Sequence, residues 1–208
     1  PTGNFGDIYA GYIGKKMGLP INKLIIATNN NDILKRAINS GIYKPSEVKQ
    51  TISPSMDIQV ASNFERLIFD ICDLSSKRVL KLMNDLKKYG EFKLEKDELK
   101  KINKIFCSES LSEKETKNTI REVYNTQGIL VDPHTAVAIG ASNKLHVEGN
   151  TIILSTAHPS KFSDVVMKET GIKPELPESV KNILIKKESY RKLPKDLKKV
   201  QNYILEKI

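Results

Sequence analysis

The stretch KLIIATNNNDILKRAINSG, residues 23–41, decides the fold class. Residues 23–28 read as a short buried strand, because the continuous apolar run at residues 24–27 is typical of a parallel strand covered on both faces. Residues 29–32 are polar and can begin a helix, whose apolar positions recur at helical spacing until Gly41 ends it. A strand, a polar loop and a helix in this order predict an α/β protein. The Asn-rich loop after the strand is either a lining element of a ligand site or a plain helix cap.

The preceding stretch, PTGNFGDIYAGYIGKKMG at residues 1–18, is a glycine-bracketed turn that leads into an amphipathic helix. Glycines allow the backbone to approach a ligand closely, and the free N–H groups at a helix start point toward the same place. The turn is therefore predicted to hold an anion, most naturally a phosphate. The alternative is a tight turn with a helix cap and no ligand.

Residues 61–128 predict a charged helical insertion beside the sheet. Capping boxes stand at Ser62–Glu65 and at Ser112–Glu115, and apolar stripes such as Leu99, Ile102 and Phe106 follow helical spacing. Arg66 would lie in the first turn of its helix, where a cation opposes the dipole, which hints at a ligand or an ion pair.

The remainder predicts a return to the sheet and a helical tail. Asp132 followed by Pro133 indicates a helix start. Residues 150–155 read as a second strand, which would carry Thr156 to the edge of the sheet where α/β proteins bind ligands.

The expected fold is thus part of an open, twisted, mostly parallel sheet with flanking helices and a helical insertion. We divide the chain into residues 1–60 (second half of a ligand-binding α/β domain), 61–128 (helical insertion), 129–171 (return to the α/β domain) and 172–208 (C-terminal helical tail).

The composition excludes several classes of function. The 208 residues carry a formal charge of +9, but the lysines are dispersed and no nucleic-acid recognition module is present. Cys72 and Cys107 have no metal-ligand partners at useful spacing, and no apolar run approaches the ~20 residues that span a membrane. His134 and His158 accompany no nucleophile motif, so hydrolysis is unsupported. We expect a cytoplasmic protein with no metal, no membrane and no nucleic-acid partner.

Taken in order, six motifs resemble the threonine synthases of bacterial and fungal type, within the fold type II family of pyridoxal-phosphate (PLP) enzymes. The resemblance covers almost the whole chain. The motifs are PTGNFGD (residues 1–7), ATNNND (27–32), SPSMDI (53–58), SNFER (62–66), LVDPHTA (130–136) and STAHPSKF (155–162).

The resemblance implies the conversion of O-phospho-L-homoserine and water to L-threonine and phosphate, a step of threonine biosynthesis, with PLP as the cofactor. Cofactor binding is carried over to Gly3, Asn4, Phe5, Gly6 and Asp7, which would hold the cofactor's phosphate, and to Thr156, which would meet the pyridine nitrogen. A neutral hydroxyl at that nitrogen moderates the cofactor's capacity to withdraw electrons. Substrate binding is carried over to Ser62, Asn63 and Arg66.

The sequence departs from the family in one respect. The lysine that holds the cofactor lies N-terminal to the phosphate loop in the family, and no position here matches it, so no catalytic residue is assigned. We expect the chain to be a C-terminal fragment that is inactive alone and that has the N-terminal part of the same protein as its partner. The alternatives are a threonine-synthase-like phospho-lyase and a non-catalytic remnant or binding fragment.

Overall fold

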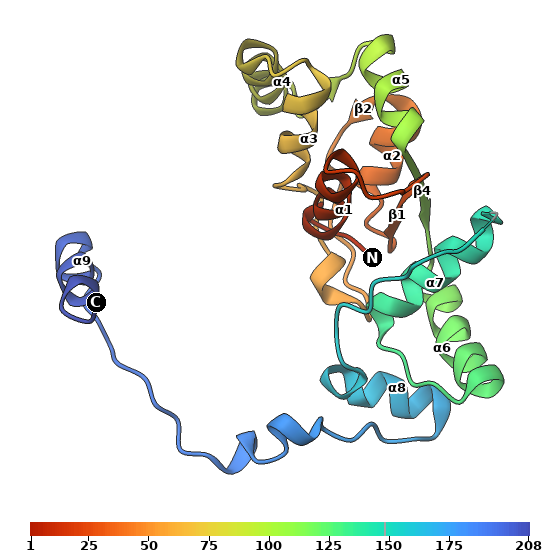
Figure 1. Cartoon of the computed structure of the whole chain (residues 1–208), viewed down its shortest axis with the longest axis vertical. Helices are drawn as coiled ribbons and strands as arrows, with labels where there is room; N and C mark the ends of the chain where they lie inside the picture. Colours follow the sequence, from red (N-terminus) through yellow and green to blue (C-terminus); the bar gives the residue numbers. More distant parts are fainter. Residues whose placement is uncertain (148) are drawn as a thin grey trace. The chain divides into compact units, whose positions relative to one another are not determined.

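The computed structural model describes residues 1–147 and 149–208 of the chain (Figure 1). The chain divides into two compact units, Pro1–Pro174 and Glu175–Ile208. The elements of the first unit are α1 (Gly6–Lys16), β1 (Leu24–Thr28), α2 (Ile33–Ser40), β2 (Ile42–Tyr43), the 3-10 turn η1 (Pro54–Met56), α3 (Phe64–Ile71), α4 (Ser76–Tyr89), β3 (Phe92–Lys93), α5 (Lys96–Ile105), β4 (Phe106–Ser110), α6 (Glu113–Gln127), α7 (Pro133–Leu145), the 3-10 turn η2 (Pro159–Phe162) and α8 (Ser163–Thr170).

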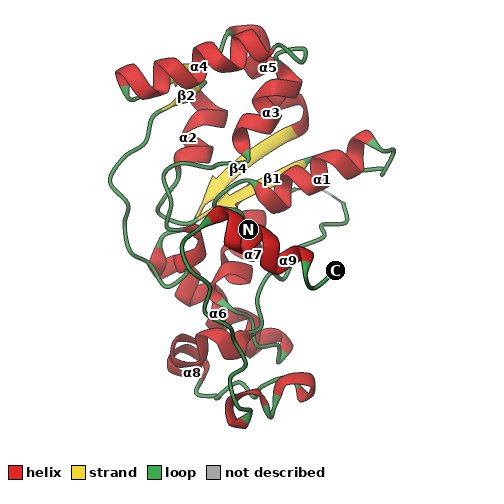
Figure 2. Cartoon of the chain, turned by 90° about the vertical axis from the view of Figure 1, so that its left-hand side faces the viewer, coloured by secondary structure: helices red, strands yellow, loops and turns green. Residues whose placement is uncertain are grey.

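The sheet at the centre of this unit pairs β1 with β4 in parallel. Its register runs from Leu24 opposite Phe106 to Thr28 opposite Ser110, so both strands end at one edge. Helices α2 and α7 each contact both strands, and α1 contacts β1. Figure 2 shows the two arrows side by side, pointing toward the region of the first residues and of α7. The prediction of an α/β fold with a parallel sheet and flanking helices is confirmed.

The main core lies between the sheet and helices α1 to α5. Its aromatic centre is Phe5, whose ring meets Phe64 edge-on at 5.2 Å and Phe106 at 5.7 Å between centroids. All three rings are at most 2% exposed. Because they come from α3, β4 and the turn before α1, the core fixes that turn against the sheet.

The helical insertion predicted at residues 61–128 is wrong in one respect, because the segment contains strands β3 and β4. Phe106, expected on a helical stripe with Ile102, instead begins β4. Ile102 and Phe106 are both buried, but from two different elements. The extended backbone from Phe106 onward is stabilised by hydrogen bonding to β1, which no local pattern reveals.

The strand predicted at residues 150–155 is also wrong, because this segment has no regular structure. Extended backbone is stable as a strand only beside a hydrogen-bonded neighbour, and no strand of the described residues pairs with it. Ile152 is 88% exposed and Leu154 51% exposed, so the segment is not covered as a strand of the central sheet would be.

Three predicted helix starts have different outcomes. The capping box of Ser112 and Glu115 is present, and Asp132 caps α7 through the N–H groups of His134 and Thr135. The box predicted at Ser62 is wrong, because Asn63 occupies the N-cap of α3 without a side-chain hydrogen bond.

The second unit contains η3 (Glu178–Val180), η4 (Ile183–Ile185) and α9 (Leu197–Leu205). Asp196 caps α9 by accepting from the Lys199 N–H at 2.9 Å, and the Arg191 guanidinium lies over the Tyr203 ring at 5.4 Å. No helix among residues 1–147 and 149–208 has both the length and the hydropathy that a bilayer crossing requires. The finer division of the chain into four segments stays a prediction.

Candidate functional site

The turn before α1 presents backbone donors at the C-terminal edge of the sheet. Thr2 N–H donates to Ala27 O of β1 at 3.0 Å, which places the turn beside the end of that strand. Within the turn, the Gly6 N–H donates to Asn4 Oδ1 at 2.9 Å. The amides of Asp7 and Ile8 begin α1 and have no acceptor within the helix, so they and the helix dipole favour an anion here.

Phe5 can serve such an anion only through its backbone. Its side chain is fully buried in the aromatic core, and its φ of +70° is a left-handed conformation that non-glycine residues rarely adopt. The core therefore holds the backbone of Phe5 in a conformation that it would not choose by itself. Strained backbone of this kind is common where a protein pre-organises a ligand site.

Gly3 is closely backed by the loop that contains η1. A Cβ at this position would lie 3.0 Å from Met56 Cα and 3.0 Å from Ser55 O, so a side chain would fit only if this backbone moved away by a few tenths of an ångström. Gly3 and the Ser55–Met56 backbone thus form one close-packed layer.

The η1 loop is in turn held by a buried amide network. Asn29 Nδ2 donates to Asp57 Oδ1 at 2.7 Å, Asn31 Nδ2 donates to the same oxygen at 3.0 Å, and the Thr51 N–H donates to Asp57 Oδ2 at 2.7 Å. Asn29 and Asn31 are only 2% and 3% exposed. The Asn-rich loop therefore supports the site from inside the protein, through two buried side chains.

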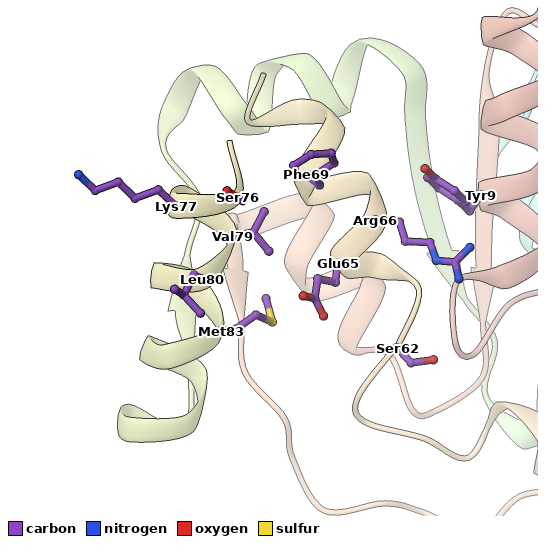
Figure 3. Close-up of a pocket in the computed structure, with 10 residues that line it drawn as sticks. All are labelled: Tyr9, Ser62, Glu65, Arg66, Phe69, Ser76, Lys77, Val79, Leu80 and Met83. Atoms are coloured by element: carbon purple, nitrogen blue, oxygen red, sulfur yellow. The ribbon is translucent and has the colours of Figure 1, made fainter. Parts of the chain in front are cut away.

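The two predicted groups of binding residues meet at Asn63. Its N–H donates to Asn4 O at 3.0 Å, and its side chain lies beside Gly6. Ser62 and Arg66 line a cavity of about 940 Å³. Its remaining walls are Tyr9 of α1 and side chains of α3 and α4 that are both apolar and polar: Glu65, Phe69, Ser76, Lys77, Val79, Leu80 and Met83. Figure 3 shows Arg66 extending from α3 toward Tyr9 of α1. An exposed guanidinium thus lies beside α1, the helix that follows the predicted phosphate loop.

A second buried polar cluster lies at the start of α7. Asp132 Oδ2 accepts from the His134 N–H at 2.9 Å and is bonded to His134 Nδ1 at 2.7 Å, while Asp132 Oδ1 accepts from the Thr135 N–H and hydroxyl. Asp132, His134 and Thr135 are at most 4% exposed. Burial by itself would raise the pKa of Asp132, but the hydrogen bonds from His134 and Thr135 outweigh it and lower the pKa.

The sequence placed His134 and Asp132 at a helix start and assigned them no role in the site. The structure adds a link to the η1 loop, where the Ser55 N–H donates to His134 Nε2 at 3.3 Å. The sequence signal for this cluster was the order Asp-Pro-His-Thr itself. It could not show the bond to Ser55, because Ser55 is 79 positions away from His134.

Thr156 is exposed and lies in the irregular segment after residue 150. Its neighbour Ser155 has its hydroxyl oxygen 3.3 Å from Thr135 Oγ1, and because the Thr135 hydrogen is donated to Asp132, the Ser155 hydroxyl is the donor in this contact. Phe162 lies against the His134 ring at 4.8 Å between centroids. The segment that carries Thr156 is therefore attached to the start of α7, and its connection to the phosphate loop runs through the α7 cluster.

Nothing in the described part of the chain suggests metal chemistry, because no three His, Cys, Asp or Glu side chains lie together there in an arrangement that could hold an ion. Cys72 is buried and its Sγ lies 3.2 Å from Glu98 Oε1. Burial and the Glu98 carboxylate raise the pKa of this thiol to about 12, so it is unreactive.

A parallel sheet whose strand ends carry a glycine turn and a helix start is the architecture of the fold type II PLP enzymes. The PLP-bound threonine synthase from Brucella melitensis has the same backbone arrangement, with a TM-score of 0.87 and 44% identity over 98% of this chain and 44% of that one.

Within this class the chain belongs to the threonine synthase family, and it corresponds to the C-terminal part of the family's sequences. The family model "Threonine synthase, C-terminal" matches residues 135–204. The threonine synthase of Pseudomonas aeruginosa is 41% identical over 207 residues, which are 98% of this chain and 44% of that protein. The human protein "Threonine synthase-like 1" is 39% identical over 93% of this chain and 26% of its own length. The chain thus spans less than half of the relatives that it matches.

Proposed function

We propose that the protein containing this chain is a threonine synthase, a PLP-dependent lyase that converts O-phospho-L-homoserine and water to L-threonine and phosphate. The observation that carries the proposal is similarity along the whole chain to threonine synthases, together with backbone agreement with a PLP-bound member. The N-terminal part of the same protein would complete the site. We also propose that the complete protein is located in the cytoplasm.

The residues present fit the phosphate of PLP. Gly3 is a position where a Cβ would collide with the backbone behind it, and the turn beyond it ends in the unsatisfied amides of α1. The loop Gly3–Asp7 would hold the phosphate through backbone N–H groups of Phe5 and Asp7. The Gly6 N–H is bonded to Asn4 Oδ1, so Asn4 would shape the turn.

Thr156 would meet the pyridine nitrogen with a neutral hydroxyl. When bound, PLP withdraws electrons from the substrate carbon that bears the amino group. A hydroxyl at the ring nitrogen leaves it without the positive charge that a carboxylate would stabilise. The contribution of Thr156 is to orient the ring and to moderate this withdrawal.

The substrate would be bound by Ser62, Asn63 and Arg66. Arg66 is exposed, lines the cavity beside α1 and has a planar fork of donors that matches a phosphate or a carboxylate. Asn63 joins this cavity to the phosphate loop through its bond to Asn4. The arrangement would place the charged end of a substrate next to the cofactor.

The test uses the complete protein with PLP and O-phospho-L-homoserine. We expect L-threonine and phosphate in equal amounts. Release of phosphate without threonine would identify a phospho-lyase, the alternative activity for a protein of this kind. If the protein neither binds PLP nor releases phosphate, it is non-catalytic and the proposal is contradicted.

A further inference from the structure

We propose that Asp132, His134 and Thr135 form a positioning unit, the α7 cluster, which holds the phosphate loop and the Thr156 segment at a fixed separation. The inference rests on the proposed function, because the two attached segments are the proposed contacts at opposite ends of PLP. None of the three side chains need touch the cofactor for this role.

The link to the phosphate loop runs through His134. Asp132 is an acceptor when ionised, so His134 Nδ1 carries the hydrogen in their 2.7 Å bond. The Ser55 N–H donates to Nε2, which must then be the acceptor nitrogen of the same ring. Ser55 O lies directly behind Gly3. A shift of the imidazole would therefore be transmitted to the backbone that supports the phosphate loop.

The link to the ring contact runs through Thr135. Its hydroxyl donates to Asp132 and also lies 3.3 Å from Ser155 Oγ, one residue before Thr156. Ile153 of the same segment packs against a buried cluster that includes Met56 and Val137. The irregular segment is thus attached to the same helix and to the same η1 loop that supports Gly3.

The geometry assigns positioning and not proton transfer to this cluster. Both ring nitrogens of His134 have partners within the protein, and Asp132 accepts four hydrogen bonds. Both residues are at most 4% exposed. Polar networks that are buried and fully bonded have a single favoured arrangement, which is the property that a fixed support requires.

The first experiment separates the two bonds of His134 in the complete protein. In His134→Gln the side-chain oxygen can accept in place of Nε2, whereas in His134→Asn the amide can donate in place of Nδ1 but cannot reach the Ser55 N–H. We expect His134→Asn to raise the PLP dissociation constant roughly fivefold, the usual effect of one lost hydrogen bond, and to shift the phosphorus NMR signal of bound PLP. His134→Gln is expected to remain closer to the wild type in both.

The second experiment addresses the ring end with Thr135→Val and Thr135→Ser. Loss of the hydroxyl is expected to shift the absorption maximum of bound PLP and to leave its phosphorus signal unchanged, while serine restores the wild-type spectrum. Thr119→Val is the matched control, because this buried hydroxyl donates to Glu115 O within α6. It is expected to change neither spectrum.

The outcomes separate this inference from the proposed function. If the wild-type protein binds no PLP, the proposed function fails. If it binds PLP but the His134 and Thr135 variants lose only thermal stability, with spectra and dissociation constants like those of Thr119→Val, the positioning role is overturned. Different spectral responses for the two positions would support it.

Discussion

The two segments proposed to contact PLP are held in very different ways. The phosphate loop is fixed by a backbone bond from Thr2 to β1, a backbone bond from Asn63 and a fully buried ring at Phe5. The segment 150–156 has no regular structure, and its Ile152 and Leu154 side chains are largely exposed. Within the described part of the chain, its one hydrogen bond to another element is that between Thr135 and Ser155.

The difference shows where pre-organisation comes from. The loop has its own conformational strain at Phe5, but the core and the η1 loop determine its position from several sides. The segment that carries Thr156 depends on the α7 cluster. Changes near the loop should therefore have large effects on stability and phosphate binding, and changes in the segment should have small effects on stability.

The largest effect is expected for Phe5→Ala. Removing a fully buried phenyl ring costs about 3–5 kcal/mol of unfolding free energy and also frees the phosphate loop. Urea denaturation of the complete protein measures the first effect and a PLP titration the second. Unchanged PLP affinity in a folded variant would show that the core does not hold the loop.

Gly3→Ala should be next, through overpacking against Ser55 and Met56. Introducing a methyl group into a closed contact costs about 1–3 kcal/mol, which corresponds to roughly a 5-fold to 150-fold loss of PLP affinity if the loop moves. Gly14→Ala is the control, because its Cβ would meet only the flexible, exposed Leu19 side chain. Equal affinities for the two variants would contradict the close-packed layer behind Gly3.

Asp132→Asn should destabilise the protein in a pH-dependent way. The pKa of Asp132 in the folded protein lies below its usual 3.8, so the ionised carboxylate stabilises the fold above that pH and this contribution is lost as the pH falls further. We expect the variant to be less stable by about 1–2 kcal/mol near neutral pH, with the difference shrinking below pH 4. Melting temperatures across this range would test it, and a constant difference would argue against an ionised Asp132 carboxylate in the folded protein.

The smallest effect is expected for Ile152→Thr. The side chain is 88% exposed, so the change should alter the unfolding free energy by less than about 0.5 kcal/mol. Denaturation of the complete protein measures it. A loss above about 2 kcal/mol would mean that the segment is buried there and would remove the contrast with the phosphate loop.

The sequence predicted much of the fold, and local patterns explain why. The apolar run before Thr28, the glycine turn at Gly3–Gly6 and the caps at Ser112 and Asp132 are all short-range signals. The residues proposed to bind PLP and the substrate came from a resemblance and stay predictions. The meeting of Asn63 with the glycine turn is an additional result of the structure.

What the sequence could not give depends on distant partners. β4 follows α5 without a turn residue, and Phe106 becomes extended because it pairs with Leu24. Residues 150–155 have the composition of a strand but no neighbour among the described strands. His134 acquires its place in the site from Ser55, and no pattern within one segment can show that bond.

The most direct test compares PLP with pyridoxal, which lacks the phosphate, in the complete wild-type protein and in Gly3→Ala. If the loop Gly3–Asp7 holds the phosphate, the wild type binds PLP far more tightly than pyridoxal. The variant then loses affinity for PLP while its affinity for pyridoxal is unchanged. Equal losses for both ligands, or none for either, would contradict the claim that this loop is the phosphate site of a threonine synthase.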